Sequence, residues 1–407
     1  MIVKRLRIGR VLCFVLSVGA CSGSDGAGPD IGGGDTADPS IVDAVDFDWT
    51  ATFVDNGIKP HIGLRQDLPI IAYMREAMGS AGWIRVVEGT AQGLGAPETL
   101  QSGYHYGPID VAVSASGSVA VAYHNHDWED AAVALNTGGG WSISRIADQG
   151  HDGWDPAVAF APDGLIHVVG IDPSQFGATQ SMEHAQVSVT GAAGGDAWDV
   201  ESLGAGAQPY EWGTDLAIDS QGVLHAVYFD HGSKDLIYAT SDGAGWTLTA
   251  IYEQGDAGRF PVIAVDEDDE PHVAFFQTDG AVNESGTVPG NIVYGSHGGG
   301  AWSFQTVGTV DEHVLGMTAA RRTVALSLTP TTSYVAFIDT AKLQMARITG
   351  TQVLTTRIVE AGDEPLLVVS MAVDSQDRPH LVYSTVPSLS EGNSGGERVW
   401  YLVGTAR

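Results

Sequence analysis

The chain has 407 residues, of which 50 are acidic and 19 basic, and its formal net charge at pH 7 is −31. This charge repels phosphate backbones and anionic lipid headgroups, which argues against nucleic-acid binding and against docking onto a membrane surface. It is compatible with cations and neutral sugars as partners, and a chain of this length can bury a large core.

The first 20 residues have the layout of an export signal. A basic start is followed by the apolar run Val11–Val18, which is shorter than the about 20 residues that a membrane-spanning helix needs. The next letters, Val18-Gly19-Ala20-Cys21, resemble the lipobox of bacterial lipoproteins. The resemblance implies that residues 1–20 are removed, that Cys21 carries the lipid, and that Ser22 directs the protein to the outer membrane, on its periplasmic or cell-surface side. The alternative is an ordinary signal peptide with a chance cysteine.

Residues 21–46 are rich in Gly, Asp, Ser and Ala and contain no Lys or Arg. Such a segment buries too little apolar surface to fold, so we expect a flexible tether. The membrane would then be contacted through the lipid anchor alone. The chain has two cysteines, and Cys13 lies in the part that is removed, so no disulfide is expected.

Seven repeated units follow in residues 47–407. Each begins with an alternating apolar strand, a tight turn with Asp or Gly, and a second alternating strand, as in residues 214–230, TDLAIDSQGVLHAVYFD. A small residue recurs in the first strand of each unit, at Gly63, Ala112, Ala159, Ala217, Ala264, Ala325 and Ala372. The spacing of about 50 residues is typical of β-propeller blades.

Two further strands complete each unit, and a tryptophan opens the fourth strand at Trp141, Trp198, Trp246 and Trp302. The seventh unit ends after its third strand, and the missing strand is found in residues 47–54, where Trp49 matches Trp246. We therefore predict an all-β fold, a seven-bladed β-propeller of four-stranded antiparallel blades, closed by an N-terminal strand that completes the last blade. The small residues are expected at the crowded axis, and the tryptophans in the wide gaps between blades.

The turn before the tryptophan resembles the Asp-box of sialidase-like propellers, which runs Ser-x-Asp-x-Gly-x-x-Trp. In the fourth unit these places hold Ala239, Ser241, Gly243 and Trp246, so the Gly and Trp are kept and the Ser and Asp are not. The resemblance implies the fold of residues 47–407 and says little about activity.

Residues shared by several units are assigned to the frame, and residues peculiar to one unit are candidates for a site. Four histidines occupy one place at the start of the second strand and are expected to pack or form hydrogen bonds there: His167, His225, His272 and His380. The acidic turn Asp266–Glu270 could bind Ca²⁺, but a solvated charged turn explains it better.

The peculiar residues gather on one face of the predicted disc, which receives the loops between second and third strands and the loops between blades. The candidates there are Tyr104, Tyr106, Trp128, Trp154, Tyr210, Glu211, Trp212, Arg259 and Phe260. The three tryptophans among them are expected in loops. His61, Asp110 and Asp215 come two residues before the small residue and are expected at the mouth of the axis. Flat aromatic side chains beside carboxylates suit a sugar or a peptide segment, unless they fold down onto neighbouring loops.

A metal site is the sharper alternative for the same face. His124 and His126 stand two residues apart, so they share one side of an extended segment. With Asp127 and either His151 or Asp152 they could supply three or four ligands to Zn²⁺.

Three functions stay open. The first is an envelope-anchored, monomeric protein that binds a glycan or a protein, and the lack of a complete catalytic set favours it. The second is a carbohydrate-active enzyme, because propellers related to sialidases and polysaccharide lyases act on this face. The resemblance to sialidases would require three arginines, whereas the face offers Arg259 alone. The third is a structural scaffold of the envelope.

Overall fold

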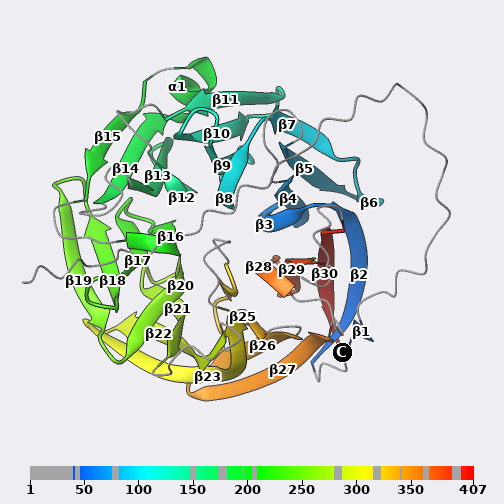
Figure 1. The fold of residues 1–407 in the computed structure, drawn as a ribbon, viewed down its shortest axis with the longest axis vertical. Helices are drawn as coiled ribbons and strands as arrows, with labels where there is room; N and C mark the ends of the chain where they lie inside the picture. The colour runs from blue at the N-terminus through cyan, green and yellow to red at the C-terminus, as the bar shows by residue number, and fades with distance from the viewer. Residues whose placement is uncertain are drawn as a thin grey trace, which may run out of the picture. The chain divides into compact units, whose positions relative to one another are not determined.

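In a computed structural model, seven antiparallel sheets stand as blades around a central axis (Figure 1). The structure describes residues 40–41, 46–75, 82–146, 153–172, 181–195, 197–203, 209–278, 287–314, 322–339, 342–360, 366–386 and 396–407. Apart from β1 and β2, which join blades made late in the chain, each blade is built from strands that follow one another, so the predicted all-β propeller with seven blades is confirmed. Within these ranges, no helix has the length and apolarity needed to span a membrane.

The blades are numbered 1 to 7 in chain order. Blade 1 contains β3 (Ile58–Arg65), β4 (Leu68–Arg75) and β5 (Trp83–Thr90), with β6 (Gly93–Leu94) and β7 (Glu98–Ser102) both paired to β5. Blade 2 contains β8 (His105–Val113), β9 (Val119–Asn125), β10 (Asp130–Asn136) and β11 (Trp141–Arg145). Blade 3 contains β12 (Trp154–Phe160), β13 (Leu165–Asp172), β14 (Ser181–Ser188) and β15 (Asp199–Ser202), with the short helix α1 (Val189–Gly194) between the last two.

Blade 4 contains β16 (Pro209–Ile218), β17 (Leu224–Asp230), β18 (Asp235–Ser241) and β19 (Trp246–Tyr252). Blade 5 contains β20 (Asp256–Val265), β21 (Pro271–Thr278), β22 (Thr287–Gly298) and β23 (Ala301–Val314). Blade 6 contains β24 (Val324–Leu328), β25 (Ser333–Asp339), β26 (Lys342–Thr349) and β27 (Gln352–Glu360), to which β1 (Ser40–Ile41) is added at the edge. Blade 7 contains β28 (Leu366–Val373), β29 (Pro379–Thr385) and β30 (Arg398–Ala406).

The ring is closed by β2 (Phe47–Asn56), which pairs antiparallel with β30 as the fourth strand of blade 7. Trp49 lies opposite Gly404, and Phe47 lies opposite Ala406. The blue strand beside the red one in Figure 1 shows this pairing. The predicted closing strand is therefore confirmed, and it continues for two residues beyond its predicted end.

The apolar core is divided among the junctions between blades. Seven clusters of buried side chains each join two neighbouring blades, among them one in which Ile70 and Ala72 of blade 1 pack with Val119 and Tyr123 of blade 2. The cluster between blade 7 and blade 1 closes the ring in the same way. Burial of apolar surface therefore holds each blade to its two neighbours.

Small inner residues and large outer ones fill the wedge-shaped junctions as predicted. A Cβ added at Gly63 would come within 2.9 Å of Val113 Cγ2, so this position is crowded. The tryptophans of the outer strands all lie in or against a cluster between blades: Trp49, Trp141, Trp198, Trp246 and Trp302.

Blade 6 requires a correction. Ala264 pairs with His272 and Ala372 pairs with His380 across their hairpins, whereas Ala325 pairs with Ala336. Ser327, which pairs with Tyr334, occupies the place of the small residue in this blade. The prediction of Ala325 was wrong because the hairpin turn sets the register, and an alanine two residues earlier fits the letter pattern equally well.

The shared histidines are hydrogen-bonded within their blades, which confirms their prediction as frame residues. In three blades the histidine joins a turn aspartate to a tyrosine of the third strand. These sets are Asp219–His225–Tyr238, Asp266–His272–Tyr294 and Asp374–His380–Tyr401, with distances from 2.5 to 3.4 Å. In blade 3 His167 is paired with His184 at 2.8 Å instead.

Candidate functional site

The inner strands of most blades begin with a bulge at the mouth of the axis. The pairing shifts near Lys59 in β3, Gly107 in β8, Asp155 in β12, Gly213 in β16 and Phe260 in β20, and all five residues have positive φ. Three of them carry side chains that rarely adopt this conformation, which costs about 1–3 kcal/mol each and is found most often at functional sites. A bulge of this kind turns the strand end and re-aims its side chains.

These bulged segments correct the expected position of two tryptophans. Trp154 opens β12 and Trp212 lies within β16, so both belong to strands, whereas Trp128 lies in a turn as predicted. The extended pairing before each bulge was invisible in the letter pattern, because the alternation of apolar residues stops there.

Three of the predicted residues link neighbouring blades around the axis. His61 Nδ1 accepts a hydrogen bond from the Val111 N–H at 3.1 Å. Asp110 Oδ2 accepts one from Val158 at 2.7 Å, and Asp215 Oδ2 accepts one from Ile263 at 2.8 Å. His61, Asp110 and Asp215 thus hold neighbouring inner strands together.

An arginine that the repeat analysis missed joins these residues. Arg322 lies just before β24, is 5% exposed, and reaches Asp110 Oδ1 at 3.2 Å and Asp215 Oδ1 at 4.0 Å with Nη1. Its Nη2 donates to the Thr214 carbonyl oxygen at 3.2 Å. These side chains and His61 line an axial cavity of about 210 Å³. We call His61, Asp110, Asp215 and Arg322 the axial cluster.

Burial shifts the pKa values of the titratable side chains in the axial cluster. It lowers the pKa of His61 to about 4 although Asp110 opposes the shift, so His61 is neutral at pH 7. It raises the pKa of Asp215 to about 7 against the pull of Arg322. Burial also acts to raise the pKa of Asp110, but His61 and Arg322 outweigh this effect, so the pKa of Asp110 is lowered.

Both ring nitrogens of His61 are therefore engaged. Because Nδ1 accepts from Val111, the proton of the neutral ring is on Nε2, which lies 3.1 Å from Asp110 Oδ1 and donates to it. In this arrangement no ring nitrogen of His61 is open to a ligand.

Two aromatic side chains, Tyr106 and Trp154, stand near the axial cluster, and we call them the rim. The rings of Tyr106 and Trp154 meet edge to face with centroids 5.4 Å apart, and the Lys59 ammonium lies 4.9 Å from the centre of the Tyr106 ring. The His124 ring lies 5.3 Å from Trp154. Thr214 connects the rim with the axial cluster. Its hydroxyl donates to the carbonyl oxygen of Asp155, which follows Trp154, and its own carbonyl oxygen accepts from Arg322. Tyr106 and Trp154 are both partly exposed.

The described members of the predicted metal set do not converge. His124 is buried, its ring centroid lies 5.9 Å from that of His126, and Asp127 accepts a hydrogen bond from the Tyr104 N–H at 2.8 Å. Across the described ranges no three His, Cys, Asp or Glu side chains come together as metal ligands. His151 and Asp152 lie outside the described residues, so a Zn²⁺ site that includes them stays a prediction.

The remaining candidates are distributed as follows. Tyr104 packs edge to face on His126 at 4.6 Å, and Trp128 packs against the core between blades 1 and 2. Arg259 forms two hydrogen bonds with Asp256 at 2.6 and 2.8 Å, and Phe260 is buried.

Other predicted residues fall outside what the structure describes. The backbone of Tyr210, Glu211 and Trp212 belongs to β16, but their side chains are not described. Cys21, the predicted lipid anchor, lies outside the described residues altogether, as does most of the predicted tether.

Solved structures that resemble this chain share its fold. An ulvan lyase, described as a polysaccharide lyase bound to GlcA(1-4)Rha3S, matches with a TM-score of 0.57 and 11% identity over 88% of this chain and 96% of its own. Polysaccharide lyase Uly1 matches with a TM-score of 0.51 and 10% identity over 87% and 90%. The lectin SapL1, in complex with α-methyl fucoside, matches with a TM-score of 0.50 and 12% identity over 75% and 97%. No protein-family model and no curated protein sequence matches the chain.

Proposed function

We propose that this protein binds a glycan at the mouth of its axis and is held in the bacterial envelope by a lipid on Cys21. The observation that carries the binding proposal is the partly exposed edge-to-face pair of Tyr106 and Trp154 near the axial cluster. Sugars stack their C–H faces on such rings and bond their hydroxyls to nearby charged groups. The lipid anchor has the lipobox-like letters as its support.

The fold neighbours add support of a general kind. By their descriptions, two are polysaccharide lyases and one is a lectin in complex with a fucoside. All three proteins are thus described with a saccharide or polysaccharide as their ligand or substrate. At 10–12% identity they share architecture alone with this chain, so the ligand must be argued from the side chains.

The geometry favours binding over lyase chemistry. A lyase needs a base that can reach the substrate and a cation that neutralises the uronate. Both nitrogens of His61 are engaged, and His124 is buried against Trp154. Asp110, Asp215 and Asp155 surround Arg322, which leaves little positive potential for a uronate. A neutral or cationic saccharide therefore fits the axial mouth better than an anionic one.

A glycan array followed by calorimetric titration with the best neutral ligand tests this proposal. Trp154→Ala should weaken binding by about 10-fold or more, because aromatic side chains at the centre of a binding site contribute most of its affinity. The control is Phe53→Ala, since Phe53 is 47% exposed on the outer strand of blade 7. Equal affinity in both variants, or the absence of any glycan ligand, would contradict the proposal.

One observation favours an enzyme as a second candidate. Asp215 lines the axial cavity and its pKa of about 7 matches a proton donor that works near neutrality. An enzyme would release new reducing ends from some polysaccharide in a panel, and Asp215→Asn would abolish that release. If the wild-type protein releases none, the carboxyl has a structural role.

A further inference from the structure

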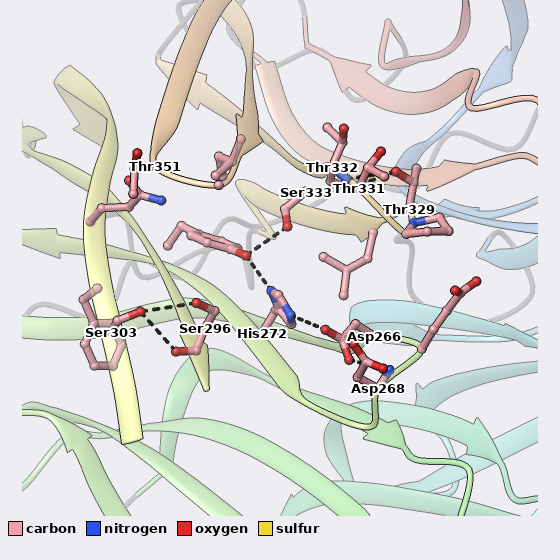
Figure 2. A pocket seen from close by; sticks show the side chains of 18 residues that line it. Asp266, Asp268, His272, Ser296, Ser303, Thr329, Thr331, Thr332, Ser333 and Thr351 are labelled. Carbon is pink, nitrogen blue, oxygen red and sulfur yellow. Dashed lines mark hydrogen bonds and ion pairs between the residues drawn. The ribbon is translucent and has the colours of Figure 1, made fainter. Parts of the chain in front are cut away.

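A second, larger cavity lies between blades 5 and 6, away from the axial mouth. Its volume is about 500 Å³, within the range of ligand pockets (Figure 2). It is lined by the hairpin turns after β20 and β24 and by the start of β23. Because each inner strand begins at the axial mouth and ends in its hairpin turn, this cavity belongs to the opposite face of the disc.

One wall of the cavity is a hydrogen-bonded chain. Asp266 is bonded to His272 at 3.0 Å and His272 to Tyr294 at 2.5 Å, as in the relays of blades 4 and 7. In this blade Tyr294 continues to Ser333 of blade 6 at 2.9 Å. Figure 2 shows the dashed lines that run from Asp266 to His272 and on to Ser333. The wall is thus fixed by frame residues and does not depend on a ligand for its shape.

Equivalent turns are clamped together at two other junctions. Between blades 4 and 5, Asp269 accepts hydrogen bonds from the Ser220 N–H at 2.8 Å and its hydroxyl at 2.6 Å. Between blades 7 and 1, Asp67 accepts the same two bonds from Ser375 at 2.9 and 2.5 Å. These bonds lower the pKa of both aspartates, as expected for carboxylates that accept short hydrogen bonds.

The clamp has no counterpart between blades 5 and 6. In three turns an aspartate accepts hydrogen bonds from the N–H groups two and four residues ahead, so these turns are equivalent residue by residue. The aspartates are Asp219, Asp266 and Asp374. The place of the clamping serine is therefore taken by Glu267. The facing turn of blade 6, Thr329–Thr332, has no aspartate and closes on itself through Thr329 and Thr332. The junction consequently lacks the bridge that joins the turns at the 4/5 and 7/1 junctions.

The chemistry of the lining is that of a polyol site. The lining includes seven Ser and Thr side chains, from Ser296, Ser303, Thr329, Thr331, Thr332, Ser333 and Thr351. Carboxylates of Glu267 and Asp268 stand at one end, with the ring of Phe304 among the lining residues. No Lys or Arg is among them. A metal ion does not fit, because no group of three suitable ligands is found in the parts of the chain that the structure describes.

We infer that the cavity between blades 5 and 6 is a second ligand site, which binds a neutral or positively charged saccharide unit. Hydroxyls and carboxylates satisfy the hydroxyls of such a ligand, and the carboxylates attract an amino group while they repel a uronate. The inference stands apart from the axial proposal, since the two sites share no residue and lie on opposite faces.

Saturation-transfer NMR with methyl β-glucoside, glucosamine and glucuronate tests the inference on the full folded domain. Ser303→Tyr should fill the cavity, and its matched control is Thr247→Tyr, which follows the outer-strand tryptophan of blade 4 as Ser303 follows that of blade 5. We expect methyl β-glucoside and glucosamine to bind and to compete with each other, and we expect glucuronate not to bind. The affinity for the first two probes should be reduced by about 10-fold or more in Ser303→Tyr.

Two further variants separate the possible failures. Glu267→Gln should weaken glucosamine binding more than glucoside binding, because it removes the charge and keeps one acceptor oxygen of the side chain. Trp154→Ala should leave unchanged the part of both signals that Ser303→Tyr removes, so that failure of the axial site is told apart from failure of this one. Absence of binding, equal loss in Thr247→Tyr, or binding of glucuronate as strong as that of glucosamine would each overturn the inference.

Discussion

The stability of the ring should depend on pH through Asp215. Its folded-state pKa of about 7 lies above the ordinary value of 3.8 because of burial. Between these two values the folded state holds more protons than the unfolded state, so the free energy of unfolding falls as the pH rises through this window. Above about pH 7 the loss is complete.

Asp215→Asn isolates this effect. Asparagine keeps an oxygen that can accept from Ile263, but it cannot ionise. At about 1.36 kcal/mol per pH unit, the wild-type protein should lose about 3 kcal/mol between pH 5 and pH 8 that the variant keeps. His61 acts in the other direction, since its lowered pKa removes stability as the pH falls from 6.5 towards 4. That loss is common to both proteins and cancels in the difference.

The difference in the free energy of unfolding is measured by urea unfolding of both proteins at pH 5 and pH 8, with intrinsic fluorescence as the signal. The control is Asp242→Asn, in an exposed turn of the same blade, which should change stability equally at both pH values. If the difference in the free energy of unfolding between wild type and Asp215→Asn is the same at pH 5 and pH 8, Asp215 is not a buried carboxyl that is half protonated near neutrality.

Three further outcomes are expected. Arg322→Met should lower the free energy of unfolding by about 3–5 kcal/mol in calorimetry, because it leaves its buried carboxylate partners uncompensated; an effect below 1 kcal/mol would mean that the cluster is not coupled. Gly63→Val should cost about 1–3 kcal/mol through overpacking against Val113, whereas Gly139→Val, with open space around it, should cost little. Cys21→Ser should abolish incorporation of labelled fatty acid and release the protein from membrane fractions; labelling that persists would contradict the lipid anchor.

The repeat in the sequence was sufficient to predict the number of blades, the closing strand and the frame histidines. Each of these is encoded several times, so one ambiguous unit did not matter. Blade 6 shows the limit of this redundancy. Ala325 and Ser327 are both small, and the choice between them depends on the length of one turn, which determines the register of the hairpin.

The site was less accessible to such reasoning. His61, Asp110 and Asp215 share a repeat position, and their predicted place at the axis followed from it. Arg322 lies outside that position and reaches the axis through the length of its side chain. Nothing in the sequence pattern indicates that Arg322 turns inward. The unbridged junction between blades 5 and 6 was equally hidden, because a missing clamp is recognised after two others have been seen.

The pairing of β2 with β30 sets the order of events when the chain is made. β2 is made early and has no partner until β30, the last strand, has been synthesised, so the ring cannot close before both strands are present. Until then the edge of β2 that β30 will cover stays open to other chains.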